Sequence, residues 1–174
     1  MSNQVLQAIS DRRSIRGYKA SPLSKEQTDI ILKAAVESPS ALNAQPWHFS
    51  VVTNQNLIRE INAEAVKNLA LDIDDIFFAA PLVIFISTDA DSRWGRLDSG
   101  IAVENMALAA HAIGLGSVIL GLPDAAFTGP PGERFNILLK FPPKHTFAVA
   151  IAIGVPTETK EAHPIEPDRI DYIN

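Results

Sequence analysis

Apolar and polar residues alternate along the chain with two periods, one typical of helices and the other of strands. Apolar residues spaced three and four positions apart predict helices over residues 4–10, 25–38, 56–69, 98–113 and 133–139. Continuous or alternating apolar runs predict strands over residues 48–53, 82–87, 117–120 and 145–153. Helical stretches therefore alternate with strand-like runs, and neither an internal repeat nor a linker divides them.

Two of the predicted helices carry clear boundary signals. Ser24 and Gln27 have the spacing of a capping box at the start of the second helix. Asp98 is predicted to cap the fourth helix, and Gly114 is predicted to end it. The fourth helix is nearly apolar and rich in alanine, which allows other helices to approach closely. We therefore expect it to be the buried central helix and a candidate for a subunit contact.

The composition is that of a folded chain with a hydrophobic core. Of 174 residues, 47% are apolar and 20% are charged. This length fits one domain over residues 1–174, with a polar, proline-bearing tail that is predicted to be extended from about residue 157. The net charge of −5 gives no reason to expect nucleic acid or a membrane surface as partner. Cysteine, a signal-peptide pattern and a bilayer-spanning apolar run are all lacking, which favours a cytoplasmic location.

The densest basic cluster reads Asp-Arg-Arg-Ser-Ile-Arg over residues 11–16. Its three guanidinium groups and one hydroxyl suit a terminal phosphate, which binds best to charged, bidentate donors. The alternative is that Arg12 and Arg13 complement the carboxyl end of the first predicted helix. The cluster alone does not decide between these two interpretations.

A second candidate is the loop between Pro39 and Pro46, which the two prolines make stiff. Within it, Asn43 and Gln45 offer both donors and acceptors, a combination that suits the polar edge of a heterocycle. The alternative is an ordinary turn from helix to strand, with Trp47 in the core.

Three glycines, Gly114, Gly116 and Gly121, invite a dinucleotide-binding interpretation. Gly114 and Gly116 follow a helix and precede a strand, whereas the dinucleotide fingerprint follows a strand and opens a helix. Gly121 is instead expected to let a ligand approach the backbone closely. The histidines lack metal-ligand spacing, and no phosphate loop or nucleophilic serine motif is present, so the sequence predicts no metal and no catalytic side chain. If the chain is an enzyme, its chemistry is expected to reside on a cofactor.

Taken together and in order, several segments resemble motifs of the FMN-dependent nitroreductase family. Each motif is weak alone, but the ordered set spans almost the whole chain and is specific. The segments are Arg-Arg-Ser-Ile-Arg-Gly-Tyr over 12–18, Pro-Ser-Ala-Leu-Asn-Ala-Gln-Pro-Trp-His-Phe over 39–49, Ala-Pro over 80–81, Asp-Ser-Gly-Ile-Ala over 98–102 with Asn105, Gly-Leu-Gly-Ser over 114–117 with Gly121, and Ala-Ile-Gly-Val-Pro over 152–156.

The resemblance implies an α+β fold with a mixed, mostly antiparallel sheet flanked by helices. It also implies an intertwined homodimer with FMN at the interface. The arginine cluster of one subunit would hold the phosphate and ribityl chain, and the loop after Pro39 of the other subunit would reach the same flavin. Backbone groups after the third predicted strand would lie near the reactive edge of the ring. In that order, the implied residues are Arg12, Arg13, Ser14 and Arg16; Pro39, Ser40, Ala41 and Asn43; and Leu120, Gly121 and Leu122.

The function that the resemblance implies is transfer of reducing equivalents from NADH or NADPH to a small acceptor such as a nitroaromatic, a quinone or an enone. The expected mechanism is ping-pong, without an essential side-chain acid or base. Two alternatives stay open at this point: an FMN-binding protein that stores or senses the cofactor without turnover, and a flavin-free dimeric interaction module.

The tail departs from the family pattern. Family members often place a lysine or arginine pair late in the chain to complete the phosphate site, whereas here only Lys160, His163 or Arg169 could serve. The affinity for FMN is therefore expected to be lower than is usual in the family. The chain is also short for the family, which predicts an open substrate pocket and broad acceptor choice.

Overall fold

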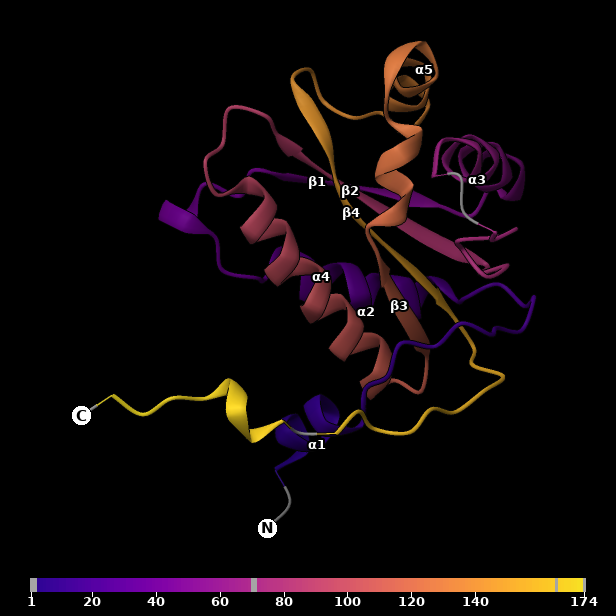
Figure 1. The fold of residues 1–174 in the computed structure, drawn as a ribbon. Helices are drawn as coiled ribbons and strands as arrows, with labels where there is room; N and C mark the ends of the chain where they lie inside the picture. Colours follow the sequence, from indigo (N-terminus) through magenta and orange to yellow (C-terminus); the bar gives the residue numbers. More distant parts are fainter. Residues whose placement is uncertain (1–2, 70–71, 165, 174) are drawn as a thin grey trace.

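A computed structural model describes residues 3–69, 72–164 and 166–173 of the chain (Figure 1). The α-helices are α1 (Gln4–Asp11), α2 (Lys25–Val36), α3 (Gln55–Leu69), α4 (Gly95–Ala112) and α5 (Gly129–Leu138). The strands are β1 (Trp47–Val52), β2 (Leu82–Asp89), β3 (Gly116–Leu120) and β4 (His145–Gly154). Short 3-10 helices are η1 (Ala41–Asn43), η2 (Leu122–Ala126) and η3 (Pro167–Arg169). Among the described residues, no helix combines the length and apolar character needed to cross a membrane.

The four strands form one sheet in the order β1-β2-β4-β3, and all neighbouring strands are antiparallel. Parallel pairing within the described residues is limited to an isolated bridge between Ser14 and Ser117. The expected α+β class with a mostly antiparallel sheet is therefore confirmed.

Helices cover both faces of the sheet and create two hydrophobic cores (Figure 1). Along β2, Leu82, Ile84 and Ile86 pack in the core that contains residues of α2 and α4. The alternate residues Val83 and Phe85 pack in the core shared with α3, η2 and α5. This alternation explains why β2 is a continuous apolar run, because both of its faces are buried.

Two helices begin three or four residues earlier than the sequence predicts. Helix α4 starts at Gly95 instead of Asp98, and Trp94 at its N-cap makes no side-chain capping bond. Helix α5 starts at Gly129 instead of residue 133, because the two prolines after Gly129 fit the first turn, where a missing N–H costs nothing. The predicted end of α4 is confirmed, since Gly114 follows it with a φ of +78°.

Paired glycines in β3 and β4 allow the N-terminal segment to pack closely on the sheet. Gly116 and Gly154 lie directly opposite each other in the two strands. A Cβ atom at Gly116 would lie 3.0 Å from the Cβ of Ile15, and one at Gly154 would lie 2.9 Å from Cδ1 of Tyr18. Tyr18 then donates a hydrogen bond to the carbonyl of Ile15 (2.5 Å), which fixes the bend of the segment.

Helix α1 and the tail leave apolar side chains uncovered. No residue of α1 is buried, and Val5 and Leu6 are 65% and 64% exposed. The tail passes α1 and runs away from the body of the molecule (Figure 1). Near its end, Tyr172 is 86% exposed. These surfaces are candidates for contact with another polypeptide.

We expect Gly154→Ala to destabilise the fold, because its Cβ would also lie 2.8 Å from Cδ of Pro81. Overpacking of this kind costs about 1–3 kcal/mol. In a domain of this size, each kcal/mol lowers the melting temperature by roughly 2–4 °C. Calorimetry of the apoprotein measures the change. Gly121→Ala is the matched control, since a Cβ there meets no atom within 4 Å; equal melting temperatures for the two variants would contradict the packing argument.

Candidate functional site

The arginine cluster forms an extended strip along the edge of the sheet. Helix α1 ends before Arg12, whose φ of −57° and ψ of 135° are extended. The backbone N–H of Ile15 donates to the carbonyl of Ser117 in β3 (2.9 Å), and the Ile15 side chain is buried. Side chains of an extended segment alternate between its two sides. Arg12, Ser14 and Arg16 therefore occupy alternate positions, and we call residues 12–16 the arginine strip.

The three guanidinium groups of the strip have different surroundings. Arg12 donates from Nε to Oε1 of Glu104 in α4 (3.1 Å). Arg13 donates from Nη1 to the carbonyls of Ser10 (2.6 Å) and Arg12 (2.7 Å), so this arginine does complement the carboxyl end of α1. The guanidinium of Arg16 lies 5.7 Å from the ring centroid of Phe78. The helix-end interpretation therefore holds for Arg13, whereas Arg12 contacts α4 instead.

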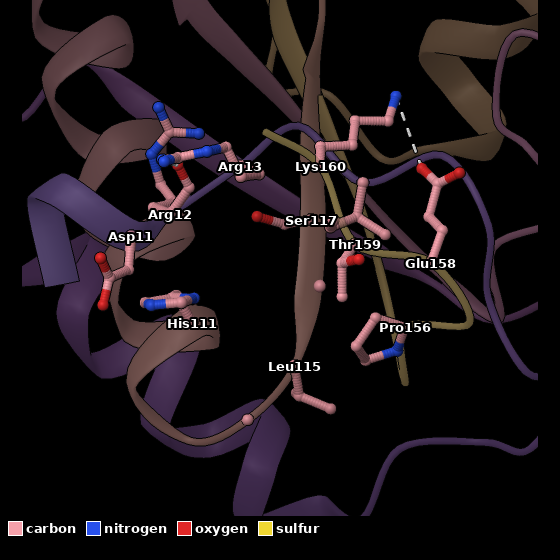
Figure 2. Close-up of a pocket in the computed structure, with 13 residues that line it drawn as sticks. Asp11, Arg12, Arg13, His111, Leu115, Ser117, Pro156, Glu158, Thr159 and Lys160 are labelled. Atoms are coloured by element: carbon pink, nitrogen blue, oxygen red, sulfur yellow. Dashed lines mark hydrogen bonds and ion pairs between the residues drawn. The ribbon is translucent and has the colours of Figure 1, made fainter. Parts of the chain in front are cut away.

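The strip borders two pockets that also include tail residues. Figure 2 shows the first, of about 270 Å³, with Arg12 and Arg13 on one side and Lys160 on another. The second, of about 320 Å³, is lined by Ile9, Ser10, Arg12, Arg13, Ser14, Ala162 and His163. Lys160 and His163 are therefore brought to the strip. Arg169 lines neither pocket and instead pairs with Glu166 (2.5 Å).

A carboxylate lies among these basic groups. Oε1 of Glu158 accepts a hydrogen bond from the backbone N–H of Arg16 (2.6 Å) and lies 3.5 Å from Nζ of Lys160. The Arg16 hydrogen bond, followed by the charge of Lys160, holds the pKa of Glu158 below its usual value. Glu158 therefore already occupies two of the groups that could receive an anion.

The loop after α2 has an unusual backbone conformation. Leu42, Asn43 and Gln45 have φ values of 54°, 55° and 48°, in the left-handed region that non-glycine residues rarely adopt. Nε2 of Gln45 donates to Oδ1 of Asn43 (3.0 Å), so part of the polar capacity of these two side chains is used within the loop. Contacts to α4 hold the loop from outside: the N–H of Ala41 donates to Oδ1 of Asp98 (3.1 Å).

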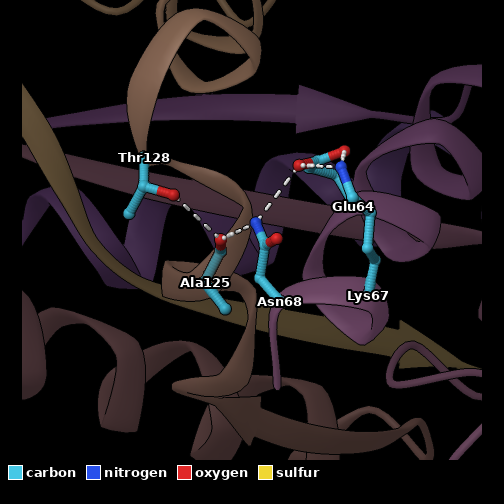
Figure 3. A network of polar contacts seen from close by, with 5 residues as sticks. All are labelled: Glu64, Lys67, Asn68, Ala125 and Thr128. Atoms are coloured by element: carbon cyan, nitrogen blue, oxygen red, sulfur yellow. Dashed lines mark hydrogen bonds and ion pairs between the residues drawn. The ribbon is translucent and has the colours of Figure 1, made fainter. Parts of the chain in front are cut away.

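The backbone after β3 is exposed on one side and anchored on the other. Gly121 and Leu122 are exposed, whereas the side chain of Leu120 is buried in the core. The following helix, η2, is tied to α3, because Asn68 donates from Nδ2 to the carbonyl of Ala125 (2.9 Å; Figure 3). Gly121 accepts a hydrogen bond from the N–H of Asp124 (3.1 Å), which closes the turn.

Within one chain, the strip and the loop lie at different faces of α4. Their contacts on this helix are Glu104 and Asp98, respectively. These positions are about 9 Å apart along the helix axis and about 120° apart around it. Neither pocket at the strip includes a residue of the loop or of the backbone after β3. The structure therefore brings together the strip and the tail, but not all three sets of implied residues.

Comparisons with known proteins identify the family of the chain. The model of the nitroreductase family matches residues 9–155. A Methanothermobacter thermautotrophicus protein, provisionally named NADH dehydrogenase/NAD(P)H nitroreductase, is 34% identical over 95% of this chain and 85% of its own. The FMN reductase [NAD(P)H] of Bacillus subtilis is 29% identical, over 95% of this chain and 71% of its own. The crystal structure of a nitroreductase with bound FMN from Desulfitobacterium hafniense DCB-2 superimposes with a TM-score of 0.92 at 30% identity, covering 100% of both chains.

The chain belongs to the nitroreductase family. The nitroreductase match contains the arginine strip, the loop and the backbone after β3, and it ends at residue 155. The tail residues beside the strip, Glu158, Lys160 and His163, thus lie beyond the part that the family model describes. This is the region in which the sequence departs from the family pattern.

Sequence reasoning missed two acidic residues of the site. Glu104 is separated from Arg12 by 92 positions, and Glu158 is separated from Arg16 by 142. No local pattern marks either pair, because each contact depends on how α4 and the tail pack beside the strip. Charge alone could have suggested that a basic cluster in an acidic chain finds acidic partners.

We expect the lowered pKa of Glu158 to be measurable by NMR titration of its carboxyl carbon. Because the folded pKa lies below the ordinary 4.5, this contact stabilises the fold above pH 4.5, and the contribution is lost as pH falls through the folded value. In Lys160→Met the pKa should stay low, since the Arg16 N–H is the larger cause. A wild-type pKa at or above 4.5 would show that the contact is absent in solution.

Proposed function

We propose that the chain is an FMN-dependent oxidoreductase that passes reducing equivalents from NADH or NADPH to a small organic acceptor. The observation that carries this proposal is the arginine strip beside a pocket that Lys160 also lines. The names of relatives add support, since they include an FMN reductase [NAD(P)H] and an NADPH-flavin oxidoreductase. Acceptors of the expected kind are nitroaromatics, quinones and enones.

The residues present fit the phosphate end of FMN. Nε of Arg13 is buried and has no hydrogen-bond partner in the described part of the chain. A buried donor of this kind favours an anion nearby. A pocket of about 270 Å³ is smaller than those that enclose a whole drug-sized ligand, so it suits only part of the cofactor. We assign Arg12, Ser14 and Arg16 to the phosphate and ribityl chain, with Arg13 alongside.

The charge balance at the strip supports a modest affinity. The phosphate would share the strip with Glu104 and Glu158, which already contact Arg12 and Arg16. Like charges repel, so each carboxylate reduces the gain from binding a dianion. His163 and Lys160 are the tail residues placed to offset this repulsion. Arg169, engaged with Glu166, is left out of the assignment.

We propose that two copies of the chain complete the flavin site. The strip and the loop lie on different faces of α4, so one copy presents them in different directions. Pro39, Ser40, Ala41 and Asn43 would reach the flavin held by the other subunit. The uncovered apolar residues of α1 and the exposed side chains near the end of the tail are the surfaces that such an intertwined dimer would bury.

The protein's part in the reaction is to bind and orient. The backbone at Leu120, Gly121 and Leu122 is assigned to the reactive edge of the ring, where N–H groups stabilise negative charge. FMN, when bound, would supply the redox chemistry of the transfer from NADH or NADPH to the acceptor. Donor and acceptor would occupy the same open place in turn, which is a ping-pong order. No side chain of the chain is assigned as acid or base.

Anaerobic absorption spectroscopy of the purified protein with FMN tests the proposal. We expect flavin bands in the visible range, and we expect NADH or NADPH to bleach them before an acceptor restores them. Bound flavin that stays oxidised with excess of both nucleotides would favour a storage or sensor protein. A protein that does not bind added FMN would contradict the proposal altogether.

A further inference from the structure

The loop at residues 39–45 needs support from outside, because its own conformation is strained. Three of its non-glycine residues have positive φ values, including Leu42 at 54°. The side chain of Leu42 is fully exposed, so packing does not hold it in place. Inside the loop, the N–H of Gln45 donates to Oγ of Ser40 (3.0 Å), which closes the turn but does not fix it to the rest of the protein.

The support comes from the first turn of α4. Asp98 is only 2% exposed, and its Oδ1 accepts the N–H of Ala41 across 57 positions of sequence (3.1 Å). Ala41 begins η1, which contains two of the three residues with positive φ, Leu42 and Asn43. Just before the loop, Nδ2 of Asn105 donates to Oγ of Ser38 (2.8 Å). Helix α4 therefore contacts this segment at two residues, Ser38 and Ala41.

The stability of the fold does not explain why a carboxylate is buried at position 98. Its second oxygen, Oδ2, is buried and has no hydrogen-bond partner among the residues that the structure describes. Burying a carboxylate with one oxygen unsatisfied costs free energy. A residue that serves only the fold would gain little from this charge, whereas residues kept for function commonly reduce stability.

We propose that Asp98 is a positioning residue for the flavin site. Through the N–H of Ala41, it holds residues 39–43 in the single conformation that meets the flavin of the other subunit. Asp98 itself does not touch the cofactor. This inference rests on the proposed FMN function and adds to it the residue on which the geometry of the loop depends.

The test compares Asp98→Ala and Asp98→Asn with Ser99→Ala, in the FMN-loaded protein. Ser99 is also buried in α4, but its hydroxyl donates to the carbonyl of Gly95 within the same helix (2.7 Å), so it is the matched control. The measurements are the dissociation constant of FMN, the visible circular dichroism of bound flavin, kcat with NAD(P)H, and the melting temperature of the apoprotein.

We expect Asp98→Ala to weaken FMN binding about tenfold to a hundredfold, the effect of one charge-assisted hydrogen bond, and to alter the flavin dichroism. Its apoprotein should melt close to the wild type, because loss of the half-satisfied carboxylate offsets loss of the bond. Asp98→Asn keeps an oxygen for Ala41 and should recover most of the affinity.

Two results would overturn the inference. One is wild-type FMN affinity and flavin dichroism in Asp98→Ala. The other is a large fall in the melting temperature of the Asp98→Ala apoprotein that is equally large in Asp98→Asn. This result would mean that Asp98 serves only the stability of the fold. Failure of the proposed function gives a different result, because the wild type and Ser99→Ala would then bind no FMN.

Discussion

The attachment of the N-terminal segment to the edge of the sheet is the constraint on which the candidate site depends. The Ile15 N–H bonds to Ser117 of β3, and Tyr18 packs over Gly154, the partner of Gly116. Burial raises the pKa of the Tyr18 phenol, so the hydroxyl stays a neutral donor to the Ile15 carbonyl. Any side chain on the paired glycines would push the segment away, and the strip would lose its place beside the tail.

A local balance of charge defines the site within an acidic protein. The chain has a net charge of −5, yet Arg12, Arg13 and Lys160 line one pocket at the edge of the sheet, whereas the guanidinium of Arg16 lies over the Phe78 ring. Glu104 and Glu158 neutralise part of this cluster. Under the proposed function, a phosphate at the strip would compete with these two carboxylates, and its affinity would depend on that competition. Helix α4 links this edge to the loop at residues 39–45.

The sequence predicts the elements well because their signals are local. In the part of the chain that the structure describes, the apolar periods locate the five α-helices and the four strands, and the Gly114 signal places the end of α4. The start of α4 is predicted wrongly because Asp98, a residue type that favours the N-cap, lies inside the first turn. Its carboxylate accepts the N–H of Ala41 and does not cap the helix. Asn43 and Gln45 are predicted as polar loop residues. Their mutual hydrogen bond forms in a loop with positive φ values, which the residue types of the loop do not predict. Contacts such as Glu158 to Arg16 require the tertiary fold.

The FMN stoichiometry of a mixed dimer tests most directly whether the strip of one copy and the loop of the other form one site. One chain carries Arg12→Ala with Arg16→Ala, the other carries Ser40→Glu, and different affinity tags isolate the mixed species. A shared site leaves one intact strip facing one intact loop. The mixed dimer should then bind one FMN with wild-type affinity, while each parent homodimer binds it at least about tenfold more weakly. A mixed dimer that binds FMN no better than its parents would contradict the account.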